Sequence, residues 1–331
     1  MSLRSLYRRS PRLRRVIRRR KQAFTYWLAR FALWVPNRVS LERSLALADR
    51  AGDLAYVALR RTRQLSLEHI EIALGPSVPR AAREQIVRAA LRNLARCFCE
   101  VAKIEEIRPR LAEYVEVEGW EHLQEVMAEG RGGIAVTGHI GNWELLAAYC
   151  ASRGVPVGAV ARRIAEPRLN HLVVDFRARS GVETVLRESP TASRQILRIL
   201  NSGGILALLI DQDTRAPSVS VPFFGRMART PAAAAALAVR RVLPILPIFM
   251  QRRAEGGHRL TILPPIRPVG GADRRQEVLQ LTGVLNKVLE DRIRKNPAEW
   301  VWWHRRWRRP PIPRLDLDRE IQYSSSNSVL S

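Results

Sequence analysis

The chain has 331 residues, enough for one large or two small domains, and 56 Lys and Arg against 31 Asp and Glu give it a formal net charge of +25. Such a surplus of positive charge indicates an anionic partner, which can be nucleic acid, an anionic membrane surface or an acidic substrate. Three cysteines without zinc-like spacing exclude a disulfide framework and a structural zinc site, and they are typical of a reducing compartment.

The N-terminal segment joins a basic stretch to a short aromatic-rich one. The first 21 residues contain ten Arg and Lys and no acid, and an apolar stretch over 23–35 follows, interrupted by Arg30. This stretch is shorter than the roughly 20 residues that span a bilayer, and its basic flanks favour a helix lying on an anionic leaflet. A signal peptide would need a small-residue cleavage site, which is missing, and a buried amphipathic helix is the other alternative.

We therefore predict that residues 1–40 associate with a membrane. The positive flank favours the cytoplasmic face of the inner (plasma) membrane, so the protein is expected there in a peripheral or monotopic form. No apolar run of about 18 residues occurs that would indicate a spanning helix.

Residues 41–128 are predicted to be helical. Apolar residues recur at spacings of three and four over 41–48 and 54–59, and again over Arg83–Lys103. Further along, Thr230-Pro231 predicts a helix start, with Thr as the N-cap and Pro at the first helical position.

From residue 129 onwards, short apolar runs alternate with helical stretches. The expected strands are Ile134–Thr137, Val155–Val160, Ile205–Ile210, Ile245–Met250 and Leu260–Leu263. Because these runs contain few polar residues, they predict an α/β fold over 129–314 with a largely parallel sheet covered by helices. The polar tail, 315–331, is predicted to be disordered.

The most informative motif is Gly138-His139-Ile140-Gly141-Asn142-Trp143-Glu144, directly after the strand that ends at Thr137. Histidine can take a proton from a hydroxyl near neutral pH, and a nearby carboxylate can orient its ring. The glycines predict a tight turn and Asn142 a helix N-cap, and such a turn is what lets His139 and Glu144 converge. An ordinary polar pair is the alternative interpretation.

A second polar group, Asp211-Gln212-Asp213, follows the strand 205–210. Two acids at this position can bind a metal, position a base or only solvate the strand end. Because sites in open α/β sheets gather at the carboxyl ends of strands, His139 and Asp211 are both candidates for one site.

Three further segments each allow two interpretations. Arg162-Arg163 can bind phosphate or lie on the surface. Val221–Arg226 places two aromatics in a loop that can form the wall of an apolar site or be anchored in the core. The Trp- and Arg-rich segment Trp300–Arg309 suits a membrane interface or single-stranded nucleic acid.

Taken in order, these motifs resemble the bacterial lipid A late acyltransferase family. The resemblance covers about residues 20 to 310 and rests on 138–144, Arg162, the acidic group at 211–213 with Val221–Gly225, and 302–307. It also extends to the wider glycerolipid acyltransferase superfamily, whose signature is His-x4-Asp/Glu, and to mycobacterial enzymes that acylate phosphatidylinositol mannosides. Arg30 in the apolar stretch, the Arg-rich start and the Ser-rich tail depart from the family pattern.

The resemblance implies a role for individual residues. His139 matches the catalytic base and Glu144 its acidic partner, while Arg162 and Asp211 match further residues of the catalytic site. The remaining positions are expected to bind substrate: Gly138, Asn142, Arg163, Asp213, Phe224 and Gly225.

The resemblance and the residues together predict acyl transfer from a thioester to a hydroxyl of a lipid A precursor. No metal or other cofactor is expected, and the co-substrate is acyl carrier protein or coenzyme A carrying the chain. Acidic acyl carrier protein, anionic membrane lipids and a phosphorylated glycolipid are the expected partners. The alternatives are another lipid acceptor, an inactive membrane scaffold or a nucleic-acid-binding protein, and the last is disfavoured because no nucleic-acid-binding motif occurs.

Overall fold

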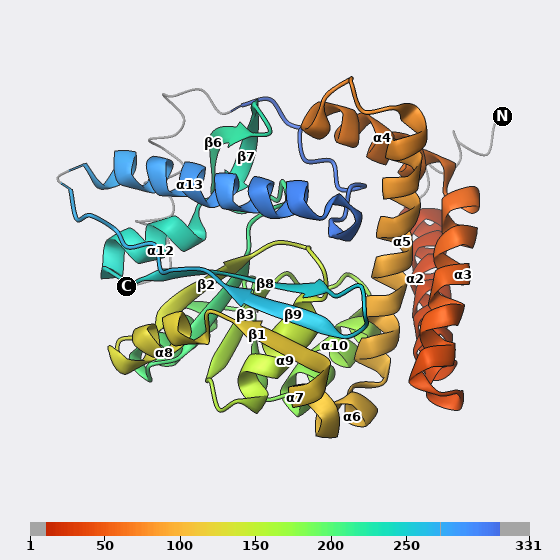
Figure 1. Cartoon of the computed structure of the whole chain (residues 1–331), viewed down its shortest axis with the longest axis horizontal. Helices are drawn as coiled ribbons and strands as arrows, with labels where there is room; N and C mark the ends of the chain where they lie inside the picture. Colours follow the sequence, from red (N-terminus) through yellow and green to blue (C-terminus); the bar gives the residue numbers. More distant parts are fainter. Residues whose placement is uncertain (1–10, 272, 312–331) are drawn as a thin grey trace.

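A seven-stranded sheet forms the centre of the fold, in the order β1-β9-β8-β2-β5-β3-β4 (Figure 1). All neighbours pair in parallel except β8 and β9, which are antiparallel, so the predicted α/β fold with a largely parallel sheet is confirmed. The strands of this sheet are β1 Val115–Glu118, β2 Gly133–Thr137, β3 Val157–Ala161, β4 Val182–Leu186, β5 Ile205–Leu209, β8 Ile245–Arg252 and β9 His258–Ile262.

The computed structural model describes residues 11–271 and 273–311. The tail predicted at 315–331 therefore lies outside the described residues, as do the first ten residues of the predicted membrane-associating segment.

The central strand β2 is buried on both faces. Ile134 and Val136 contribute to one hydrophobic cluster and Ala135 to the other, as the alternation of side chains along a strand requires. Helices α12 (Ala233–Arg241) and α13 (Arg274–Lys295) cover one face, and α8 (Trp120–Ala128) and α9 (Trp143–Ser152) cover the other (Figure 1).

The five predicted strands are all present, with ends that differ by at most two residues. The sheet begins earlier than expected, because β1 lies inside 41–128, which was predicted to be helical throughout, and pairs with β9. The short edge strand β4 was also missed, since its Val-Glu-Thr-Val-Leu sequence is only partly buried and gives no continuous apolar run.

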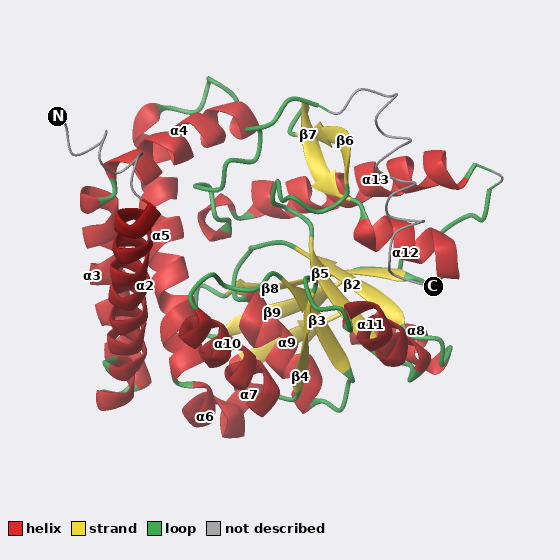
Figure 2. Cartoon of the chain, turned by 180° about the vertical axis from the view of Figure 1, so that it is seen from behind, coloured by secondary structure: helices red, strands yellow, loops and turns green. Residues whose placement is uncertain are grey.

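Three long helices stand side by side at one end of the molecule (Figures 1 and 2). They are α2 (Pro11–Trp34), α3 (Leu41–Ala58), which joins both predicted stretches into one helix, and α5 (Arg80–Ala102). None of the helices in the described part of the chain is long and apolar enough to cross a bilayer. The remaining helices are α4 Arg60–Leu74, α6 Ile104–Ile107, α7 Leu111–Tyr114, α10 Pro167–Arg179, α11 Ala192–Asn201 and the 3-10 turns η1 Pro36–Arg38, η2 Arg108–Arg110 and η3 Pro297–Glu299.

A separate antiparallel hairpin, β6 (Ser218–Phe223) with β7 (Arg226–Pro231), corrects two predictions. The segment Val221–Arg226 is not a loop but the tip of this hairpin. Thr230-Pro231 ends β7 instead of starting a helix, and α12 begins at Ala233 with Ala232 as its cap. Thr230 is fully buried and bonded to Asn286 of α13, so tertiary contacts override its capping preference.

Candidate active site

His139 lies in the turn between β2 and α9, as the sequence predicted. Asn142 caps α9, because its Oδ1 accepts a hydrogen bond from the amide of Leu145 at 3.1 Å. Gly141 has φ 60°, and a Cβ added there would lie 1.8 Å from the carbonyl oxygen of Met250, so this position requires glycine. The turn is therefore fixed by its neighbours on both sides.

Asp211 reaches His139 from the adjacent strand. In the β2–β5 register Thr137, the last residue of β2, stands opposite Leu209, the last residue of β5. His139 and Asp211 therefore each lie two positions beyond this matched pair. Asp211 accepts a hydrogen bond from the His139 amide at 2.9 Å, and its other oxygen lies 2.9 Å from His139 Nδ1. A Cβ at Gly138 would lie 3.2 Å from the Asp211 side chain, so the small residue at 138 permits this close approach.

The carboxylate of Asp211 is completely buried and also accepts a hydrogen bond from Trp300 Nε1 at 2.8 Å. Burial alone would raise the pKa of Asp211, but the charge and hydrogen bonds of His139, together with the bond from Trp300, lower it to about 2. An ionised carboxylate can only accept, so Nδ1 carries the proton and Nε2 stays free to act as a base. The His139 side chain is 26% exposed and can be reached from solvent.

The expected hydrogen-bonded pair of His139 and Glu144 is not what the structure shows. Both carboxylate oxygens of Glu144 accept from Arg177 of α10, at 2.9 and 2.6 Å. The residue that contacts the His139 ring from α9 is Trp143, edge to face at 4.8 Å between ring centroids. Orientation of His139 by Glu144 is therefore corrected: Asp211 performs it, because the strand register brings Asp211 to Nδ1 while the first turn of α9 points Glu144 towards α10.

The two arginines after β3 lie at the same edge of the sheet, but the structure gives them no contact with His139. The Arg162 side chain is 70% exposed, and its nearest acid is Glu188 at 4.0 Å. The amide of Arg163 donates to Glu188 at 3.0 Å, which fixes the loop. Both guanidinium groups remain accessible to a ligand.

The side chain of Asp213 is 3% exposed and forms a two-pronged ion pair with Arg309, whose Nε lies 2.8 and 3.0 Å from the two carboxylate oxygens. Phe224 and Gly225 form the hairpin tip, both with positive φ. Phe224 is buried and its amide donates to Glu290, so the core-anchored interpretation is confirmed and that of an exposed apolar wall is wrong.

The Trp- and Arg-rich C-terminal segment turns inward, which the sequence reasoning missed. Trp300, Trp302 and Arg306 are among the largest fully buried side chains. Arg306 donates to the carbonyl of Arg229 and the hydroxyl of Thr230 and lies over the ring of Phe223. Their burial contradicts a surface on which these side chains meet membrane or nucleic acid.

The same segment brings His304 close to the site. Burial lowers the pKa of His304 to about 4, and the charges of Asp211 and His139 act on it, so this second imidazole is neutral near pH 7. Burial likewise lowers the pKa of Arg306 to about 10. The order His-Arg-Arg-Trp after two tryptophans was visible in the sequence, but only the fold shows that it faces inward.

Neither a metal site nor a cysteine nucleophile is evident in this part of the molecule. Within residues 11–271 and 273–311, no three His, Cys, Asp or Glu side chains are grouped so as to hold a metal ion. Burial raises the pKa of the Cys150 thiol to about 12 and that of Cys97 further still, so both are protonated near pH 7. The arrangement around His139 therefore joins a partly exposed imidazole to a buried carboxylate at Nδ1.

Known proteins resemble the chain over most of its length. Residues 14–309 match the family described as bacterial lipid A biosynthesis acyltransferase. The lipid A biosynthesis palmitoleoyltransferase of Escherichia coli is 24% identical over 88% of this chain and 94% of its own, and the lauroyltransferase of the same organism is 25% identical over 86% and 92%. The phosphatidylinositol mannoside acyltransferase of Mycolicibacterium smegmatis is 25% identical over 69% of this chain and 74% of its own.

Proposed function

Because the chain belongs to the bacterial lipid A biosynthesis acyltransferase family, we propose that it moves a fatty acyl chain from acyl carrier protein to a hydroxyl of a lipid A precursor. The observation that carries this proposal is the hydrogen-bonded chain from Trp300 through Asp211 to His139 at the carboxyl ends of β2 and β5. It provides the oriented base that an acceptor hydroxyl needs.

The reaction follows from this geometry. Nε2 of His139 removes the proton of the acceptor hydroxyl as its oxygen attacks the thioester carbon, and Asp211 stabilises the imidazolium. The tetrahedral oxyanion then collapses, the carbon–sulfur bond breaks, and the leaving thiolate takes the proton from His139. No acyl-enzyme intermediate is required.

The oxyanion needs hydrogen-bond donors, and one donor is typically worth about 3–4 kcal/mol. The amides of His139, Gly141 and Asn142 already donate to Asp211, Glu299 and Met250. We therefore assign this role to the exposed guanidinium of Arg162, which lies at the same edge of the sheet.

Helix α2 carries the features of a membrane-binding surface. Phe24, Trp27, Leu28, Phe31 and Trp34 recur at helical spacing, and each is between 52% and 70% exposed. The exposed basic residues at the N-terminal end of the same helix suit anionic headgroups. In the proposal this face lies in the cytoplasmic leaflet of the plasma membrane, and the basic surface also docks acidic acyl carrier protein.

Phosphatidylinositol mannoside is the second candidate acceptor, because the mycobacterial relative is as similar in identity as the lipid A enzymes, although over less of the chain. Purified protein with labelled acyl–acyl carrier protein or acyl-coenzyme A should be offered each acceptor separately, and the products identified by mass spectrometry. The proposal expects acylated lipid A precursor with the carrier-protein donor. Acylation of the mannoside alone would replace the acceptor, and absence of any acylated lipid would contradict the proposal.

A further inference from the structure

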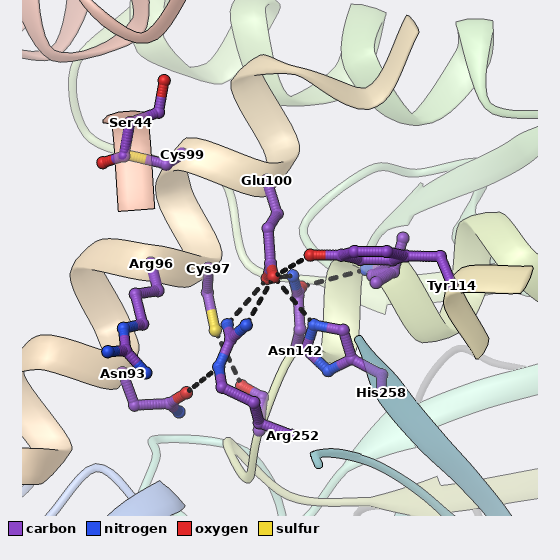
Figure 3. A network of polar contacts seen from close by, with 12 residues as sticks. Ser44, Asn93, Arg96, Cys97, Cys99, Glu100, Tyr114, Asn142, Arg252 and His258 are labelled. Atoms are coloured by element: carbon purple, nitrogen blue, oxygen red, sulfur yellow. Dashed lines mark hydrogen bonds and ion pairs between the residues drawn. The ribbon is translucent and has the colours of Figure 1, made fainter. Parts of the chain in front are cut away.

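A buried polar network reaches the turn that carries His139 through Asn142 (Figure 3). Its centre is Glu100 of α5, whose side chain is fully buried. Both of its oxygens accept from Arg252 of β8, at 2.6 and 2.9 Å. It also accepts from Tyr114 Oη at 2.7 Å and lies 2.9 Å from His258 Nε2.

This carboxylate is ionised although it has no contact with water. Burial would raise the pKa of Glu100, but the charges and hydrogen bonds of His258 and Arg252 hold it well below its usual range. A buried, fully paired charge fixes the groups around it, because any displacement leaves a charge uncompensated.

The fourth partner residue of Glu100 belongs to the catalytic turn. Asn142 donates from Nδ2 to Glu100 at 2.9 Å, while its Oδ1 caps α9. One helical turn before Glu100, the thiol of Cys97 lies 3.3 Å from the carbonyl oxygen of Gly141. Helix α5 therefore holds two consecutive residues of the turn that carries His139.

The network also reaches the turn from its other side. The amide of Arg252 donates to the side chain of Glu299 at 2.9 Å, and the carbonyl of Glu299 accepts from the Gly141 amide at 3.0 Å. The next residue, Trp300, bonds to Asp211. The positions of His139 and Asp211 thus depend on two segments that meet through Arg252 and Glu100.

We propose that Glu100 is a positioning residue for acyl transfer: through Asn142 it fixes the turn 138–142 and so holds the His139 ring on Asp211. Glu100 touches no reacting atom in this arrangement. The inference rests on the proposed function for its catalytic consequence, whereas its geometric content can be tested without any substrate.

The test exchanges donor and acceptor between the two residues. Asn142→Asp keeps the helix cap but directs a second carboxylate at Glu100, and we expect about a tenfold or larger loss in kcat with little change in KM. In Glu100→Gln/Asn142→Asp the glutamine amide can donate to the new carboxylate. This double variant should recover kcat to within about threefold of Glu100→Gln alone.

A spectroscopic readout separates positioning from folding. The ring-nitrogen NMR signals of His139 should shift in Asn142→Asp and return in the double variant. Asp53→Asn is the matched control. It disrupts the two-pronged ion pair, at 2.8 and 2.6 Å, between Asp53 of α3 and Arg92 of α5, the helix that also carries Glu100, and this pair lies away from the turn. It should lower the thermal midpoint and leave both kcat and the His139 signals unchanged.

The inference would be overturned if Asn142→Asp lowered kcat by the same factor in the wild type and in Glu100→Gln. It would also be overturned if the His139 signals moved as much in Asp53→Asn as in Asn142→Asp. If the wild-type protein acylates none of the tested lipids, the proposed function fails, but the His139 signals still decide whether Glu100 positions the ring.

Discussion

At the scale of single residues, the site consists of a histidine and an aspartate that are 72 positions apart in sequence and 2.9 Å apart in space. The motif 138–144 predicted the turn and the helix cap correctly, because these depend on local chemistry. The orienting acid depends on strand order, which a five-residue motif does not contain. Asp211 was a candidate because it follows a strand, but its contact with His139 came from the parallel register of β2 and β5.

This assignment predicts opposite outcomes for the two carboxylates. Asp211→Asn should change the tautomer of His139, seen in its ring-nitrogen NMR signals, and lower kcat by about 10³-fold or more. Glu144→Gln should leave those signals in place, because Glu144 contacts Arg177. A tautomer change in Glu144→Gln but not in Asp211→Asn would restore Glu144 as the orienting acid.

Glu299 predicts a pH dependence of stability. Burial raises the pKa of Glu299 from 4.5 to about 7, so folding favours its protonated form. This contribution to the free energy of unfolding is about 3 kcal/mol at most. It is fully present below pH 4.5 and is lost as the pH rises through about 7.

Glu299→Gln removes the ionisation but keeps an acceptor for the amide of Arg252. Urea unfolding between pH 4.5 and 8 should show that the variant gains stability relative to wild type as the pH rises. Parallel curves for the two proteins would contradict the assignment.

At the scale of elements, strands buried on both faces were predictable from their continuous apolar runs, as β2 and β5 illustrate. Strand β4 and the hairpin β6–β7 were not, since their sequences mix apolar residues with Glu, Thr, Ser or Arg. The C-terminal tryptophans gave a surface interpretation because composition alone does not show that Trp300 bonds to a buried carboxylate.

The turn between β2 and α9 predicts a sharp glycine requirement. Gly141→Ala combines a positive φ with a Cβ that collides with Met250, and it should cost on the order of 2–4 kcal/mol of stability and lower kcat. Gly154→Ala is the control, because Gly154 has φ 82° but open space around it. Thermal unfolding and activity of the two variants should differ clearly, and equal effects would mean that backbone strain alone matters.

The exposed face of α2 predicts vesicle binding. Trp27→Ser/Phe31→Ser removes two large apolar side chains and should weaken binding to vesicles that contain phosphatidylglycerol about tenfold or more. Val269→Ser, which changes a 94% exposed residue outside α2, should bind like wild type. Co-sedimentation measures both variants, and unchanged binding of the α2 variant would exclude this helix as the membrane surface.

At the scale of the whole molecule, the parallel sheet places the carboxyl ends of its central strands at one edge, and α5 stands between the sheet and α3 (Figure 1). Helix α2 stands beside α5 (Figure 2), and α5 also contacts α9, which follows the catalytic turn. The proposed membrane contact and the catalytic turn are therefore joined through α5. The overall charge of +25 suits both anionic lipid and an acidic carrier protein, and it indicates that activity should fall as ionic strength rises.

The central claim is that His139, held by Asp211, is the base for acyl transfer to a lipid hydroxyl. The most direct measurement is the initial rate of labelled acyl transfer from acyl carrier protein to a lipid A precursor by the wild-type protein and by His139→Ala. The account predicts product with the wild type and a loss of about 100-fold or more in the variant. A variant that transfers the acyl chain at the wild-type rate would contradict it.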